Sequence, residues 1–250
     1  NNPYLIVGTY NSNSSDGIYV YQLDDKTGNL TKVSNVKTSN ASYLTISPKG
    51  NFVYAVNENG NDHNTGGAVS AFAFDKKSGI LSFINQESTK GNDPCYIDID
   101  KSGKWLSVAN YSGGSLSLLP VLQNGSIGKI AAQVQHFGKG INTERQEKPH
   151  VHCVIFSKSG NYVAVTDLGI DQLFLYPIDK NKGVVNEQNA ISTKVTAGAG
   201  PRHVVFHPTK KYVYLIEELT GSISVFKWVE NKLTLVQNTI MIAASNLEGN

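Results

Sequence analysis

Short apolar segments alternate with turn residues along the whole chain, and one combination of the two recurs. A Pro/Ser/Lys/Gly-type turn precedes an aromatic and β-branched segment in SPKGNFVYAVN (47–57), DKSGKWLSVAN (100–110), SKSGNYVAVTD (157–167) and HPTKKYVYLIE (207–217). Equivalent positions Gly50, Gly103, Gly160 and Lys210 are 53, 57 and 50 residues apart. A period near 50 residues is typical of the blades of a β-propeller.

Each repeat predicts four short strands. Alternating apolar segments at 43–46, 96–99, 153–156 and 203–206 precede the recurrent turn and form a hairpin with the segment after it. A third strand follows at 67–72, 114–119 and 221–226, and acidic or Gly turns at 25–30, 75–81 and 123–127 introduce a fourth. Helical periodicity does not persist for more than a few residues. We therefore expect an all-β protein, a β-propeller of four-stranded antiparallel blades.

The count of strands limits the architecture further. The chain opens on the equivalent of a second strand at 4–9, and five sets of strands two to four are present with four first strands. The tail at 243–250 shows no convincing first strand. Because an unpaired blade edge leaves backbone groups unsatisfied, two interpretations remain: an atypical five-bladed ring, or, as we favour, an incomplete part of a larger ring.

The composition limits the kinds of partner and location that are expected. The 22 Lys+Arg and 20 Asp+Glu residues leave a charge of +2, which argues against nucleic acid. No apolar run reaches about 18 residues, so no membrane span is expected. Cys95 and Cys153 are 58 residues apart without metal-binding spacing, so both are expected to be free and buried. We expect a cytoplasmic protein, with export as the alternative because the chain starts Asn-Asn-Pro without Met.

Polar residues at the ends of the second strands are the first candidates for a site at the channel. Alignment of the repeats places five of them at one position: Thr9, Asn57, Asn110, Asp167 and Glu217. The next position holds Tyr10, Glu58, Tyr111, Leu168 and Glu218. Residues at equivalent strand positions form rings around a propeller channel, although polar residues also simply mark strand ends.

Two further segments carry imidazole and guanidinium groups. His150 and His152 are two residues apart and are expected to face the same side of a sheet, and Arg202 and His203 occupy the corresponding place one blade later. A zinc site from both His residues with Asp167 or Glu218 is a minor alternative, and we expect neither metal nor cofactor. Arg202 suits a phosphate or carboxylate, or else a salt bridge between blades.

The remaining histidines have no such setting. His63, His136 and His207 are not next to the paired motifs and are expected in loops or at the surface. Gly113 and Gly114 are interpreted as a hairpin turn and not as a phosphate-binding loop, because no Lys and no helix follow them.

Five segments together resemble the lactonase family of seven-bladed β-propellers. They are 109–115 (ANYSGGS), 149–152 (PHVH), 166–171 (TDLGID), 200–203 (GPRH) and 217–219 (EEL), in the family's order. The resemblance implies hydrolysis of a sugar lactone, above all 6-phosphogluconolactone in the pentose phosphate pathway. It also implies a small phosphorylated or carboxylated lactone as the partner, while the oligomeric state stays open. The alternatives are a lactonizing cycloisomerase and a non-catalytic propeller used for binding.

The resemblance also assigns roles to individual residues. His150 or His152, of which we favour His152, and Glu218 are implied as acid/base residues, and Arg202 as the anchor of the substrate's anion. Further residues are expected to line the substrate site: Asn110, Asp167, His203 and Glu58.

Two departures from the family pattern bear on this. The family usually has Asn where Glu217 stands, and its last two blades, with a further basic residue, have no counterpart here. We therefore expect residues 1–250 to form a single β-propeller domain that lacks those two blades and the closing strand.

Overall fold

The computed structural model describes residues 3–11, 14–60 and 66–241, which fold into five antiparallel sheets. The first sheet contains β1 (Tyr4–Gly8), β2 (Gly17–Leu23) and β3 (Leu30–Lys37). The second contains β4 (Leu44–Ile46), β5 (Phe52–Asn57), β6 (Ala68–Asp75) and β7 (Ile80–Ser88). The third contains β8 (Pro94–Ile99), β9 (Trp105–Asn110), β10 (Ser115–Pro120) and β11 (Ala132–Gln135).

The last two sheets complete the set. The fourth contains β12 (Val151–Phe156), β13 (Tyr162–Asp167), β14 (Gln172–Asp179), β15 (Val184–Val185) and β16 (Ile191–Lys194). The fifth contains β17 (Pro201–Phe206), β18 (Tyr212–Glu217), β19 (Ser222–Val229) and β20 (Lys232–Ile240). In the described residues the first sheet has three strands, as the repeat predicts, and the others have four or five.

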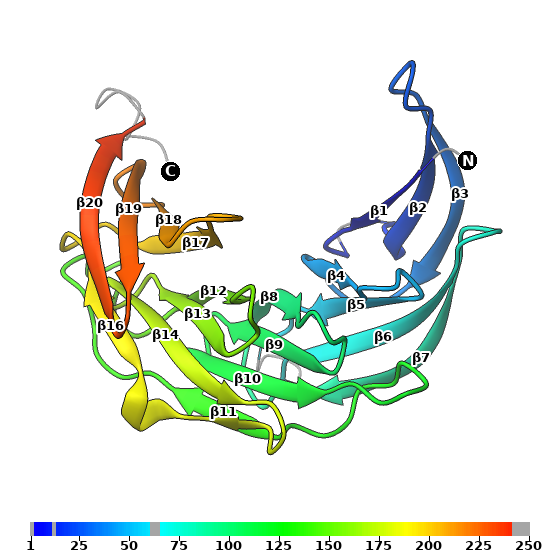
Figure 1. Cartoon of the computed structure of the whole chain (residues 1–250). Coiled ribbons are helices and arrows are strands. Elements are labelled where there is room, and N and C mark those ends of the chain that lie inside the picture. The colour runs from blue at the N-terminus through cyan, green and yellow to red at the C-terminus, as the bar shows by residue number, and fades with distance from the viewer. Residues whose placement is uncertain (1–2, 12–13, 61–65, 242–250) are drawn as a thin grey trace.

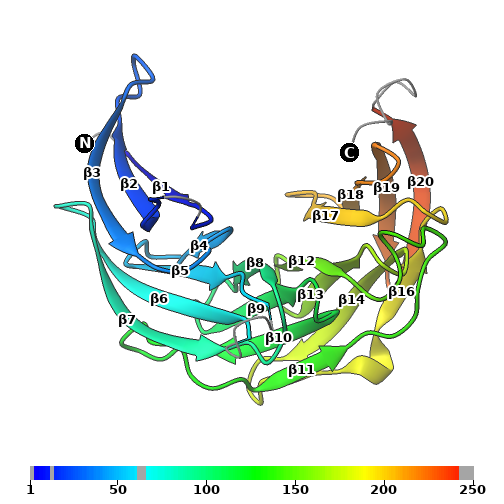
Figure 2. The same ribbon diagram turned by 180° about the vertical axis from the view of Figure 1, so that it is seen from behind.

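The five sheets follow one another around an open arc, with β1 to β3 at one end and β17 to β20 at the other (Figure 1). Seen from behind, the same arc has β4, β8, β12 and β17 on its inner side and β3, β7, β11 and β20 on its outer side (Figure 2). The predicted propeller blades are confirmed, and the first strand of each later blade faces the channel.

The recurrent turn joins the first and second strands of the blades. In the third blade, buried Asp100 accepts hydrogen bonds from the backbone N–H groups of Lys104 (2.8 Å) and Trp105 (2.9 Å). Gly103 of the same turn has φ of 70°. Only glycine adopts this left-handed conformation without steric cost, which explains why this glycine punctuates the repeat.

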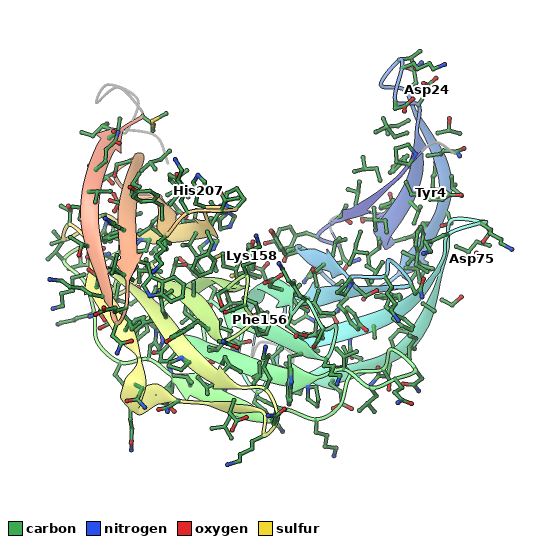
Figure 3. All side chains as sticks on the ribbon, viewed as in Figure 1. Tyr4, Asp24, Asp75, Phe156, Lys158 and His207 are labelled. Carbon is green, nitrogen blue, oxygen red and sulfur yellow. The ribbon has the colours of Figure 1, made fainter. Side chains whose placement is uncertain are left out.

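The outer turns use a similar device. Asp24 and Asp75, at the tips of the first two blades in Figure 3, each accept a hydrogen bond at 2.9 Å from the backbone N–H two residues later. The N–H of Lys26 lowers the pKa of Asp24, and the hydroxyl of Ser78, followed by the N–H of Lys77, lowers the pKa of Asp75. Asp side chains favour such turns for this reason.

The hydrophobic core is divided among the contacts between neighbouring blades. Each of four clusters of buried side chains joins two consecutive blades; Leu116 and Leu118 of the third blade, for example, pack with Val154 and Val163 of the fourth. The central strands are therefore covered on both faces and have continuous apolar runs. Cys153 is buried and Cys95 half-buried, and both are free thiols.

The sequence did not predict the short addition to the fourth blade, β15 with the 3-10 turn Glu187–Asn189. Within the described ranges, no helix is long and apolar enough to cross a membrane.

Candidate active site

The polar residues that end the second strands lie inside the blades. Asn110 is fully buried, and its amide donates to the hydroxyls of Ser115 (3.0 Å) and Ser117 (2.9 Å) on the adjacent strand. Asn57 likewise accepts a hydrogen bond from Ser70 (2.7 Å). Asn110 was predicted to line the substrate site; the structure places its side chain inside its own blade.

Asp167 is also buried, and its carboxylate belongs to an internal network. Oδ2 is 2.7 Å from Nδ1 of His136, and Oδ1 accepts the backbone N–H groups of His150 (2.8 Å) and Gly169 (3.0 Å). His136 Nε2 lies 3.0 Å from the hydroxyl of Tyr176. Asp167 was predicted to line the substrate site; the structure places its carboxylate inside the blade, where its acceptors hold the start of β12.

The sequence predicted His136 in a loop or at the surface. It is buried, not at the surface, because it pairs with a carboxylate 31 residues away that no local pattern reveals. His207 is in a turn as expected, where Nδ1 accepts the backbone N–H groups of Thr209 (3.1 Å) and Lys210 (3.0 Å). His63 lies outside the described residues.

One residue further along, Glu218 is the centre of a charged cluster. Arg202 Nε donates to Glu218 Oε2 at 2.8 Å, and Arg145 Nη2 donates to Oε1 at 2.5 Å. Burial would raise the pKa of Glu218, but the hydrogen bond and charge of Arg145, with the charges of His152 and Arg202, hold it below its ordinary value. Glu218 is therefore a carboxylate at neutral pH.

His152 lies beside this cluster. Its Nε2 is 3.9 Å from Glu218 Oε2, its side chain is 13% exposed, and the ring of His203 is 5.3 Å away. Burial, followed by the charges of Arg202 and His203, lowers the pKa of His152 to about 4. Burial and Arg202 also lower the pKa of His203. In the described part of the chain Nδ1 of His152 is buried without a hydrogen-bond partner. The imidazole is thus neutral at neutral pH.

His150 has a different environment. A β-bulge between Val151 and Cys153 breaks the regular alternation of β12. The His150 ring stacks on Tyr111 at 4.4 Å, and its Nε2 is 3.1 Å from both carboxylate oxygens of Glu147. Both rings contact Tyr111, whose ring is 5.5 Å from that of His152, but of these two histidines it is His152 that lies beside Glu218. The structure therefore separates two histidines that the sequence left equivalent.

Arg145 is the residue that sequence reasoning missed. It lies in the loop before β12, outside the repeat, and is contributed from a different part of the chain than Arg202 and Glu218. Composition held a signal for it: Arg145 and Arg202 are the two arginines of a chain that has 20 lysines. Both arginines contact the same carboxylate, so their rarity marks the site.

The aromatic wall of the channel extends the cluster to the second blade. Tyr43 and Tyr96 stack at 4.0 Å, and the Tyr96 ring is 5.3 Å from His203. Beyond them, Glu58 accepts hydrogen bonds from Tyr10 (2.8 Å) and from Ser42. Of the predicted residues, His152, Arg202, His203 and Glu218 are together, and Glu58 lies at the far end of this wall.

The structure does not assemble the zinc alternative. No group of three or more His, Cys, Asp or Glu side chains in the described ranges is placed to hold a metal ion. Asp167 faces His136 instead of the two candidate histidines, and His150 turns to Glu147.

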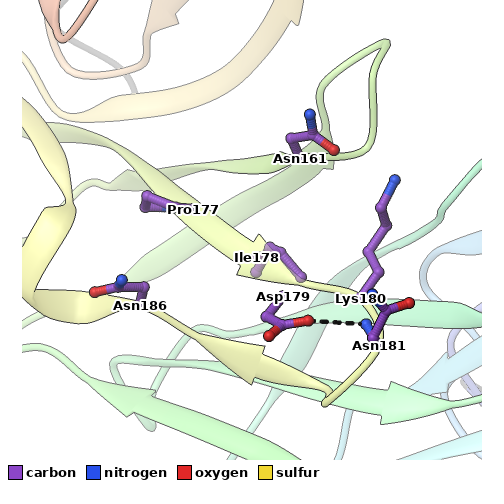
Figure 4. A pocket seen from close by; sticks show the side chains of 7 residues that line it. All are labelled: Asn161, Pro177, Ile178, Asp179, Lys180, Asn181 and Asn186. Atoms are coloured by element: carbon purple, nitrogen blue, oxygen red, sulfur yellow. Dashed lines mark hydrogen bonds between the residues drawn. The ribbon is translucent and has the colours of Figure 1, made fainter.

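Pockets elsewhere do not contain the predicted chemistry. One of about 440 Å³ lies at the outer turn of the fourth blade, lined by Asn161, Pro177, Ile178, Asp179, Lys180, Asn181 and Asn186 (Figure 4). There Asp179 accepts the backbone N–H of Asn181 at 3.0 Å, which is a turn contact. A groove of about 670 Å³ between the second and third blades is lined by Lys49, Lys101, Lys104 and Lys180 with Phe52 and Trp105. Neither contains a histidine.

Fold and site together define a β-propeller with an Arg–Glu–Arg cluster and a neutral histidine at its channel. Residues 4–250 match the family described as "Lactonase, 7-bladed beta-propeller", and the chain belongs to this family. A 6-phosphogluconolactonase of Bacillus subtilis (strain 168) is 36% identical over 218 residues, which are 87% of this chain and 60% of that protein. The chain thus spans less than two thirds of this relative.

Two solved structures resemble this chain in both sequence and fold. The crystal structure of a putative 6-phosphogluconolactonase from Bacteroides fragilis NCTC 9343 is 37% identical, with a TM-score of 0.89, and the match covers 96% of this chain and 68% of that one. A periplasmic gluconolactonase of Pseudomonas aeruginosa is 33% identical, with a TM-score of 0.88 over 96% of this chain and 69% of that one.

Proposed function

We propose that the protein is a lactonase that hydrolyses a sugar lactone, above all 6-phosphogluconolactone to 6-phosphogluconate in the pentose phosphate pathway. Family membership and the names of relatives support this. The observation that carries it is the cluster itself: a neutral, partly buried imidazole beside a carboxylate that two guanidinium groups hold ionised. A further part of the proposal is that the five blades belong to a seven-bladed ring.

The chemistry requires a base, an anchor and a route for one proton. His152 removes a proton from water as the water oxygen bonds to the lactone carbonyl carbon. Arg202 anchors the substrate's anion or stabilises the developing oxyanion. When the ring C–O bond breaks, His152 returns the proton to the leaving alkoxide. Glu218 stays ionised and stabilises the imidazolium formed in between.

The bound substrate improves this base. The charge of Arg202 is one cause of the low pKa of His152, and a phosphate on Arg202 offsets that charge. The pKa of His152 then moves towards the working pH, where a general base is most effective. An anionic lactone therefore prepares the base that attacks it.

The alternative of a non-catalytic propeller predicts Arg202 in a structural salt bridge, and Arg202 does pair with Glu218. A structural pair would balance its charges. Here the ion pairs found in the described ranges give one carboxylate to two guanidinium groups, which leaves a positive charge for a ligand. We therefore prefer the enzyme. We also propose a cytoplasmic location, because phosphorylated sugars do not cross membranes unaided, with export as the alternative.

The test is a lactonase assay of the purified protein with 6-phosphogluconolactone and with unphosphorylated gluconolactone. His152→Asn is expected to lower kcat by about 10²–10⁴-fold, the contribution of a general base. His150→Asn is the matched control, expected to keep kcat within about threefold, because its ring contacts Glu147. Equal activity of both variants and the parent would refute the assignment.

A further inference from the structure

Two arginines in a chain of 20 lysines converge on one carboxylate, and the two contacts are not equivalent. Arg202 uses Nε on Glu218 Oε2, and Arg145 uses Nη2 on Oε1. Both side chains keep access to solvent, at 42% and 39% exposed. A guanidinium has five N–H donors and binds phosphate or carboxylate through two at once, whereas an ammonium acts as a point charge. Each arginine therefore retains donors for a ligand.

The other carboxylates nearby do not neutralise the excess positive charge of Arg145 and Arg202. Glu147 is 3.1 Å from His150, and Glu58 bonds to Tyr10 and Ser42 on the second-blade side. Within the described residues, Glu218 is the carboxylate that forms ion pairs with Arg145.

The loop that holds Arg145 is fixed in place. Gln146, the next residue, is fully buried, and its amide donates to the Asp171 carboxylate at 2.7 Å. Asp171 also accepts the backbone N–H of Gly200 at 2.9 Å, two residues before Arg202. One carboxylate thus ties the loop of Arg145 to the strand of Arg202.

The same loop is tightened from within. Asn142 Oδ1 accepts the backbone N–H of Arg145 at 3.1 Å, and Gln146 Oε1 accepts that of Asn142 at 3.1 Å. A Cβ at Gly140 would lie 2.4 Å from the Gln146 side chain, so this packing requires glycine. Groups held in advance bind a ligand with a smaller loss of conformational entropy.

We propose that Arg145 is a specificity-determining residue: with Arg202 it forms a two-guanidinium clamp for the substrate's phosphate, and this clamp sets the preference for a phosphorylated lactone. The inference rests on the proposed function and deepens it. Asp171 and Gln146 are positioning residues that set the spacing of the clamp. Glu218 accepts a hydrogen bond from both guanidinium groups and so holds them close enough to share one ligand.

The experiment compares Arg145→Gln and Arg145→Lys with Lys148→Gln, an exposed control on the same loop. The measured quantity is the ratio of kcat/KM for 6-phosphogluconolactone to that for unphosphorylated gluconolactone. We expect Arg145→Gln to lower this ratio by about 10- to 100-fold, as for loss of a charge-assisted hydrogen bond. Arg145→Lys is expected to keep part of the parent's ratio, and Lys148→Gln is expected to leave the ratio unchanged.

A ratio that stays unchanged in Arg145→Gln refutes the clamp, even if both activities fall together, since that result makes Arg145 a partner of Glu218 alone. If the parent hydrolyses neither lactone, the proposed function fails, and calorimetric titration with inorganic phosphate then tests the clamp by itself. Weaker phosphate binding by Arg145→Gln than by Lys148→Gln supports it, and equal binding refutes it.

Discussion

Glu217 and Glu218 are adjacent in the sequence and have the same side chain, yet they belong to different parts of the protein. Glu217 is 1% exposed and accepts hydrogen bonds from Ser224 (2.8 Å), Ser222 and Asn238 (3.2 Å) inside its blade. Glu218 faces the channel with two arginines and His152. The strand alternation of side chains separates them. The last residue of the strand thus has a structural role inside the blade, whereas the next residue belongs to the candidate site.

The same separation holds in the third blade, and the fourth departs from it. Asn110 is buried in its blade, whereas the Tyr111 ring stacks against His150 at the channel. In the fourth blade Asp167 is buried and so is Leu168. The set of residues that directly follows the second strands (Tyr10, Glu58, Tyr111, Leu168 and Glu218) is therefore interrupted at the fourth blade, and of its two carboxylates it is Glu218 that pairs with arginines.

The largest expected effect separates the two glutamates directly. Glu218→Ala should lower lactone hydrolysis by about 10²–10⁴-fold, because the imidazolium loses its counter-charge, with little change in urea midpoint. Glu217→Ala should lower the free energy of unfolding by about 2–4 kcal/mol, because two buried serine hydroxyls and the amide of Asn238 lose their acceptor, and leave kcat nearly unchanged. Parallel assays and urea titrations measure both. The contrast fails if Glu217→Ala is the less active protein.

The next prediction concerns Asp167, the buried polar residue that ends the second strand of the fourth blade. Asp167→Ala should destabilise the fold by about 3–5 kcal/mol, because it breaks a buried pair with His136 and removes the acceptor for the His150 backbone N–H. Urea denaturation measures this, with exposed Asp179→Ala as the control. A loss below about 1 kcal/mol would mean that Asp167 does not hold the start of β12.

The smallest expected effect is the change in stability with pH that the protonation of His152 at the channel causes. The pKa of His152 is about 4 in the folded protein against an ordinary 6.5. Its neutral form therefore stabilises the fold fully above pH 6.5, and this contribution is lost as the pH falls towards 4. The cost reaches about 3 kcal/mol at about 1.4 kcal/mol for each pKa unit.

The measurement compares the parent with His152→Gln, which does not titrate. Between pH 7.5 and pH 4 the free energy of unfolding of the parent should fall by about 3 kcal/mol more than that of the variant. Asp98, whose pKa burial raises to about 6, acts in the opposite direction in both proteins and cancels. Equal pH dependence would contradict a buried neutral His152.

The repeat made most of the fold predictable from sequence, because each copy carries its own turn, with Gly103 as an example, and its own central strand. The proximity of His152, Arg202 and Glu218 followed from equivalent places in neighbouring repeats. The burial of Asn110 and Asp167 could not be predicted, because strand ends alone do not reveal which face is covered. Arg145 lies in a loop without a counterpart in the other repeats, so no alignment of blades could place it.

The buried residues of each of the four core clusters come from two consecutive blades, and Tyr96 of the third blade also packs against the cluster between the fourth and fifth. Cohesion in such an architecture is a sum of nearest-neighbour terms, as in stacked repeat proteins. The candidate site draws on two neighbouring blades, because His152 lies on the fourth and Arg202 and Glu218 lie on the fifth. Loosening the seam between these two blades is therefore expected to disturb the site more than loosening the seam between the first and second blades.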